Sequence, residues 1–182
     1  AALSGALYAG GSGYLMDFFT HVAFVDDPAK VYTVTTHACF PPLAYCLYWL
    51  IRQVLPVAAA GGRISHTMFR ESYPSLLVYT VYASLLAGLL FLLVRRYLRR
   101  ETGLRAGAAA VLLMLSNVFV AGLLERGNSA YIVLVLLLAA FLLRDSEAGW
   151  KRELALLCIA VAAGLKLYPA IFGLLYLRER RW

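Results

Sequence analysis

Two basic residues at the ends of apolar runs, Arg126 and Lys166, are the side chains best suited to bind a charged substrate. Arg126 lies between Glu125 and Gly127, and Lys166 lies shortly before Pro169. Ionisable residues at membrane depth are costly and usually functional, and two cations at an outer interface suit a lipid-linked phosphate. The alternative is that Arg126 pairs with Glu125 and that Lys166 extends to the lipid headgroups. Against this alternative, Gly127 and Pro169 predict that both cations lie on preorganised turns.

Asp17 is the carboxylate best placed to act as a general base. It follows a glycine-rich segment and precedes an apolar run that contains several phenylalanines. Burial beside such rings favours the protonated carboxyl, whereas a nearby Arg or Lys favours the carboxylate. The alternative is a residue at a helix N-terminus whose side chain accepts hydrogen bonds from backbone N–H groups.

The remaining polar residues predict neither a metal nor a cofactor. His21 and His37 could bind phosphate or a metal, but their spacing matches no metal-ligand motif. The pair Asp26–Asp27 precedes a proline, which is typical of a turn. The run Gly10–Gly13 lacks both the Lys-Ser/Thr of a Walker loop and the GxGxxG spacing, so a soluble nucleotide donor is not expected.

The composition places these residues in a membrane protein. The chain has 182 residues, of which 62% are hydrophobic and 15% charged, and its mean hydropathy is +0.74. Several apolar runs of roughly 15–20 residues suit a bilayer core about 30 Å thick. The net charge of +7 comes from Lys and Arg clustered between these runs, as in cytoplasmic loops, and predicts no nucleic-acid partner. We therefore expect an all-α, polytopic membrane helix bundle.

The apolar runs and basic clusters predict one transmembrane domain with the following segments. They are the end of a truncated first span at 1–9, an external loop at 10–74 with an interfacial helix at 42–57, and membrane helices at 76–94, 106–124, 129–143, 154–165 and 169–177. Basic residues follow the spans 76–94 and 129–143, which places both following loops in the cytoplasm. The last two helices then form a hairpin, and the alternative is one proline-kinked span.

This topology gathers most of the polar residues able to do chemistry on the outer side. They are Asp17, His21, Asp26, Asp27, His37, Glu125, Arg126, Asn128, Lys166 and Tyr168. The interfacial helix is expected to begin at Pro42. Its Tyr45, Tyr48 and Trp49 are expected at headgroup depth, where amphipathic rings are favoured.

Several short motifs carry a resemblance to a known family. They are Glu125–Asn128 at the start of a span, Gly164–Pro169, the basic end Arg178–Arg181, Met16–Phe19 after the first helix, and Cys39–Tyr45 at the start of the next. Together they resemble glycosyltransferase family 87, the polyprenyl-phosphate-mannose-dependent transferases of the GT-C superfamily. Family members are longer than this chain, so we interpret it as a fragment.

The resemblance implies an integral plasma (inner) membrane enzyme whose active site faces away from the cytoplasm. It would transfer a hexose, by the family's preference mannose, from a polyprenyl-phosphate donor to a lipid or glycan acceptor with inversion and no cofactor. By resemblance Asp17 would be the base, and Arg126 and Lys166 would hold the donor phosphate. Further candidates for substrate binding are His21, His37, Glu125, Asn128 and Tyr168.

Two other classes of protein stay open at this point. In a transporter or flippase, Arg126 and Lys166 would bind an anionic or lipid-linked substrate and Asp17 would relay protons. Transporters commonly contain internal repeats, and this sequence shows none. In a non-catalytic membrane scaffold, these three side chains would diverge in space.

Overall fold

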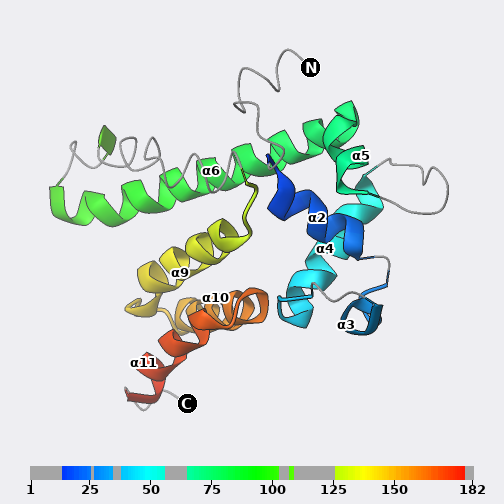
Figure 1. Ribbon diagram of the computed structural model, residues 1–182. Coiled ribbons are helices and arrows are strands. Elements are labelled where there is room, and N and C mark those ends of the chain that lie inside the picture. Colours follow the sequence, from blue (N-terminus) through cyan, green and yellow to red (C-terminus); the bar gives the residue numbers. More distant parts are fainter. Residues whose placement is uncertain are drawn as a thin grey trace.

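Figure 1 shows the computed structural model, which describes residues 14–25, 27–34, 38–55, 65–102, 107–108 and 126–178. All regular secondary structure in these ranges is helical, which confirms the predicted all-α class. The elements are α2 (Met16–Phe24), α3 (Val31–Val34), α4 (Pro42–Val54), α5 (His66–Glu71), α6 (Tyr73–Thr102), α9 (Ala130–Arg144), α10 (Gly149–Leu165), the 3₁₀ helix η3 (Tyr168–Phe172) and α11 (Gly173–Arg178). The polytopic GT-C arrangement stays a prediction.

Helix α6 is long and apolar enough to cross a bilayer over Tyr73–Leu98, a stretch of 26 residues. At 1.5 Å per residue this stretch reaches about 39 Å. Its exposed residues Leu77, Val81 and Leu85 follow at four-residue intervals, so they form one apolar stripe on the helix surface. Such a stripe is suited to contact with lipid. The helix is longer than the predicted span at 76–94 because it continues past the arginines that follow residue 94, such as Arg95 and Arg96.

Helices α9 and α10 pack side by side and run in opposite directions (Figure 1). After α10 the chain turns at Lys166 and Leu167, and η3 and α11 lead back toward the end of α9 (Figure 1). Phe141 of α9 meets Phe172 of η3 edge to face, with ring centroids 5.4 Å apart. The region 154–177, for which two arms are predicted, is therefore divided between α10 and the pair η3 and α11.

The aromatic face of α4 differs from the prediction. Helix α4 begins at Pro42, but Tyr45 and Tyr48 are only 1% and 2% exposed, and they pack against α2. These two rings therefore do not contact lipid headgroups, because they fill the space between two helices of the protein itself; the depth of α4 in the membrane stays a prediction. Leu50 and Val54, which are 57% and 63% exposed, form the outer face of α4.

Helix α2 is the centre around which the site is built. It lies between α4, α5 and the beginning of α6 (Figure 1), and Phe18, Phe19 and Val22 are almost completely buried. Phe18 meets Tyr79 of α6 with ring centroids 5.0 Å apart. This apolar side of α2 anchors the helix, so that its polar residues lie at a defined place. The predicted spans at 1–9 and, except for 107–108, at 106–124 lie outside the described residues.

Candidate active site

A tight turn before α9 brings residue 127 against α2. Gly127 has a φ of +68°, in the left-handed region that side chains with a Cβ disfavour. A Cβ at this position would also lie 2.7 Å from the Cβ of Phe18. The turn can therefore approach α2 only with glycine at position 127. This close approach places the flanking residues Arg126 and Asn128 beside the first turn of α2.

Asp17 is held by both flanking residues of this turn. Its Oδ1 lies 3.1 Å from Nη2 of Arg126 in a salt bridge, and its Oδ2 accepts a hydrogen bond of 3.0 Å from Nδ2 of Asn128. The backbone N–H of Asp17 donates to the carbonyl oxygen of Arg126 at 3.1 Å. Asn128 is oriented by its Oδ1, which accepts from the N–H of Ala130 at 2.9 Å. Three hydrogen bonds thus join segments more than a hundred residues apart in the sequence.

These contacts argue against one interpretation that the sequence leaves open for Asp17, that of a helix cap, and its role as a base stays a prediction. Its carboxylate is bound by two side chains, so it does not serve mainly as a cap for the backbone of α2. Arg126 forms its ion pair with Asp17, and Glu125 lies outside the described residues. The Asp17 and Arg126 side chains are 25% and 50% exposed. The pair is therefore accessible to solvent and to a ligand.

His21 lies one helical turn after Asp17, among aromatic rings. Its ring centroid is 4.4 Å from that of Phe40 and 5.3 Å from that of Tyr48. Burial lowers the pKa of His21 from 6.5 to about 4; the negative charge of Asp17 acts in the opposite direction, and the positive charge of Lys166 lowers the pKa further. His21 is therefore neutral near pH 7.

Lys166 is placed by the contact between α10 and α4. A Cβ on Gly164 would lie 2.7 Å from Cδ2 of Leu43, so the two helices touch closely at this point. The backbone N–H of Lys166 donates to Ala162 at 2.9 Å at the end of α10. Nζ of Lys166 lies 4.4 Å from the ring centroid of Phe40. Partial burial lowers the pKa of Lys166, and this effect is opposed by Cys39 and Asp17.

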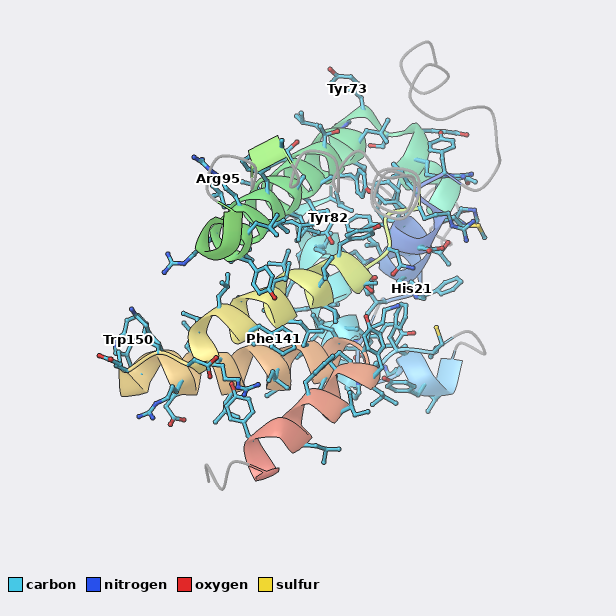
Figure 2. The ribbon with its side chains drawn as sticks, turned by 90° about the vertical axis from the view of Figure 1, so that its left-hand side faces the viewer. His21, Tyr73, Tyr82, Arg95, Phe141 and Trp150 are labelled. Atoms are coloured by element: carbon cyan, nitrogen blue, oxygen red, sulfur yellow. The ribbon has the colours of Figure 1, made fainter. Side chains whose placement is uncertain are left out.

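The predicted acid and the two predicted cations therefore share one region. Asp17 and Arg126 are in contact, and Phe40 and His21 connect this pair to Lys166. Figure 2 shows His21 at the opposite end of the molecule from Arg95 and Trp150. A non-catalytic scaffold whose functional side chains diverge does not fit this arrangement.

The model of glycosyltransferase family 87 matches residues 38–182, which is more than half of the chain. The chain belongs to glycosyltransferase family 87. The resemblance noted from short motifs is thereby confirmed, and the protein is a membrane-associated glycosyltransferase that acts on a donor and an acceptor. The match includes Arg126 and Lys166, whereas Asp17 and His21 precede it. None of the curated proteins and none of the solved structures compared with the chain matches it.

The other predicted site residues of this family 87 protein have different surroundings. Tyr168, at the start of η3, is 55% exposed. Asp27 lies in a turn, as expected, where its Oδ1 accepts from the N–H of Ala29 at 3.0 Å and its Oδ2 lies 3.3 Å from Nζ of Lys30. His37, Glu125 and Asp26 lie outside the described residues. Within the described ranges, no group of three His, Cys, Asp or Glu side chains could hold a metal ion.

Sequence reasoning missed the aromatic part of the site. Phe40, Tyr45 and Tyr48 surround His21, whereas the sequence predicts the two tyrosines at the lipid interface and no role for Phe40. The signal that could have identified them is their position: Phe40 directly precedes the double proline, and the tyrosines are three residues apart on α4. Residues spaced in this way lie on the same face of a helix.

Proposed function

We propose that this family 87 glycosyltransferase transfers a hexose, mannose by family preference, from a polyprenyl-phosphate donor to a lipid or glycan acceptor. The transfer inverts the anomeric carbon, needs no metal, and takes place on the non-cytoplasmic face of the plasma membrane. The observation that carries the proposal is the contact of Asp17 with Arg126 at 3.1 Å in a region that also contains Lys166. A base and two cations are the groups that this reaction requires.

The proposed chemistry uses each of the three side chains once. An acceptor hydroxyl oxygen attacks the anomeric carbon and forms the new glycosidic bond, while the bond from that carbon to the phosphate oxygen breaks. The hydroxyl proton passes to the carboxylate of Asp17. The leaving polyprenyl phosphate gains negative charge, which Arg126 and Lys166 stabilise. Lys166 is partly buried, and a partly buried cation stabilises such charge better than the same cation in water.

The salt bridge between Asp17 and Arg126 suggests that the donor binds before Asp17 acts as a base. Without donor, Arg126 and Asn128 form hydrogen bonds with both carboxylate oxygens of Asp17, so an acceptor hydroxyl would meet oxygens that already have partners. A donor phosphate competes with Asp17 for the Arg126 guanidinium, because Arg binds phosphate oxygens as well as carboxylate oxygens. Donor binding would therefore release one oxygen of Asp17 at the time when a base is needed.

The arrangement of the helices supports a site on the outer, non-cytoplasmic side of the membrane. The turn at 126–128 lies near the beginning of α6, since a Cβ on Gly127 would lie 3.3 Å from Cε2 of Tyr79. The end of α10 is connected to the site through Lys166, which lies over Phe40 beside His21. The arginines Arg95 and Arg96 lie near the other end of α6, where the positive-inside rule predicts cytoplasm. The site would then lie on the opposite side of the membrane.

The test compares Asp17→Asn with Asp27→Asn, a matched control in a turn outside the site, in the full-length protein in membranes. We expect Asp17→Asn to lower the transfer rate about 10²- to 10⁴-fold with donor binding at least as tight as in the wild type, because Arg126 then has no carboxylate that competes with the phosphate, and Asp27→Asn to have little effect. Arg126→Gln and Lys166→Gln should weaken donor binding as well as the rate. Normal turnover by Asp17→Asn would exclude it as the base. Movement of labelled donor across the membrane without transfer would favour the flippase.

A further inference from the structure

The ammonium of Lys166 lies over the ring of Phe40, with Nζ 4.4 Å from the ring centroid. A cation within about 6 Å of an aromatic face is attracted by the negative charge of that face. We propose that Phe40 is a positioning residue: its ring holds the Lys166 ammonium at the place where the donor phosphate binds. This inference rests on the proposed function, because it assigns to Phe40 the task of preparing one of the two phosphate ligands.

The backbone of Phe40 is fixed from two sides. The hydroxyl oxygen of Tyr45, on α4, accepts hydrogen bonds from the N–H groups of Cys39 and Phe40 at 3.0 and 3.4 Å. The hydroxyl of Tyr32, on α3, donates to the carbonyl oxygen of Phe40. Tyr45 is 1% exposed, so this anchor is itself held by packing. The ring of Phe40 is thus carried by a backbone segment that has little freedom to move.

The contact leaves the ammonium available to an anion. Among the described residues no carboxylate forms an ion pair with Lys166, and the ring next to Phe40 is the neutral imidazole of His21. Asp17, a carboxylate whose charge acts on Lys166, is already bound by Arg126. A donor phosphate can therefore bind Lys166 without breaking an ion pair. The aromatic ring orients the cation, and the phosphate supplies the opposite charge.

If Phe40 positions Lys166, substitutions of Phe40 should change donor binding in a specific pattern. Phe40→Leu keeps an apolar side chain but removes the aromatic face, and it should weaken donor binding about two- to thirty-fold. The effect should fall on KM for the donor more than on kcat. Phe40→Tyr retains the face and should bind donor nearly as well as the wild type. In a Lys166→Gln background, Phe40→Leu should cause no further loss, because the cation that it positions is absent.

The experiment measures binding of polyprenyl phosphate, with uncharged polyprenol as the second probe, to the full-length protein in detergent or nanodiscs. Phe141→Leu is the matched control, since Phe141 is also a partly buried aromatic residue but packs on Phe172. A trifluorinated phenylalanine at position 40 keeps the shape of the ring while weakening its negative face. Thermal unfolding of each variant verifies that it is folded.

The possible outcomes separate this inference from the proposed function. Weaker binding of polyprenyl phosphate by Phe40→Leu and by the fluorinated variant, with normal binding by Phe141→Leu, supports the positioning role. Normal phosphate binding by both Phe40 variants, together with weak binding by Lys166→Gln, overturns the role of Phe40 and leaves the proposed function intact. Equal losses from Phe40→Leu with and without Lys166 also overturn it. Equal affinity of the wild type for the phosphate and the alcohol would overturn the phosphate site itself.

Discussion

Replacement of Gly127 by alanine tests whether the turn before α9 organises the site. Gly127 has a φ of +68°, and a Cβ there would lie 2.7 Å from the Cβ of Phe18 and 3.3 Å from Cε2 of Tyr79. The left-handed conformation costs a residue with a Cβ about 1–2 kcal/mol. Forcing a carbon atom into a packed region costs about 1–3 kcal/mol. Gly127→Ala should therefore lower the free energy of unfolding by about 2–5 kcal/mol.

Gly127→Ala should also disturb the geometry of the site and lower the transfer activity. The atom in the way is the Cβ of Phe18, which is attached directly to the backbone of α2 and cannot rotate aside. The turn must therefore move, and Arg126 and Asn128 move with it, so both hydrogen bonds to the Asp17 carboxylate should weaken. We expect Gly127→Ala to transfer sugar more slowly than the wild type even at temperatures at which it remains folded.

The assay is thermal or denaturant unfolding in detergent, with transfer activity measured on the same samples. Gly88→Ala is the matched control, because Gly88 lies within α6 and a Cβ there would meet nothing within 4 Å. Alanine favours a helix over glycine by about 1 kcal/mol, so this control should be at least as stable as the wild type. If Gly127→Ala is as stable and as active as the wild type, the close approach of the turn to α2 is refuted.

Three more predictions concern the surroundings of the site. The pKa of His21 is lowered from 6.5 to about 4 in the folded protein, so the unfolded chain binds the proton first as the pH falls. Acidification from pH 7 to 5 should then cost up to about 2 kcal/mol of unfolding free energy, a loss that His21→Gln should remove in pH-dependent unfolding. Gly164→Leu should push α4 away at Leu43 and raise KM for the donor, whereas Gly173→Leu, with open space around it, should not. Arg52→Met should lower stability by about 1 kcal/mol in denaturant unfolding, because it removes hydrogen bonds to carbonyl oxygens at the end of α2; unchanged stability would show that these bonds contribute little.

Hydropathy predicts where the apolar parts of helices lie, but not where the helices end. Helix α10 begins at Gly149, five residues before the predicted arm at 154–165, because Lys151, Arg152 and Glu153 are good helix formers that simply remain in water. The arginines after residue 94 extend α6 in the same way. Prolines are a better guide to local structure, since α4 begins at Pro42 as predicted.

The contact between Asp17 and Arg126 could be predicted only in part. The alternation of apolar runs and basic loops predicts that both residues lie on the outer side of the membrane, but it does not predict the distance between them. Contact depends on the left-handed turn at Gly127 and on the packing of Phe18 below it. Both are properties of the tertiary structure, and no periodicity in the sequence reports them.

The tyrosines of α4 show why residue type alone does not predict what a helix face packs against. Tyr and Trp are favoured both at lipid interfaces and in contacts between protein elements, so residue type alone does not separate these environments. Arg52 does not separate them by its type, because arginine is also favoured at the headgroup interface. It follows Tyr45 and Tyr48 at helical spacing and therefore lies on the same face. In the folded chain its Nη1 donates to the carbonyl oxygen of Ala23 at 2.9 Å. This tertiary contact with α2 assigns the aromatic face of α4 to the site around His21, and the residue types of α4 alone do not report it.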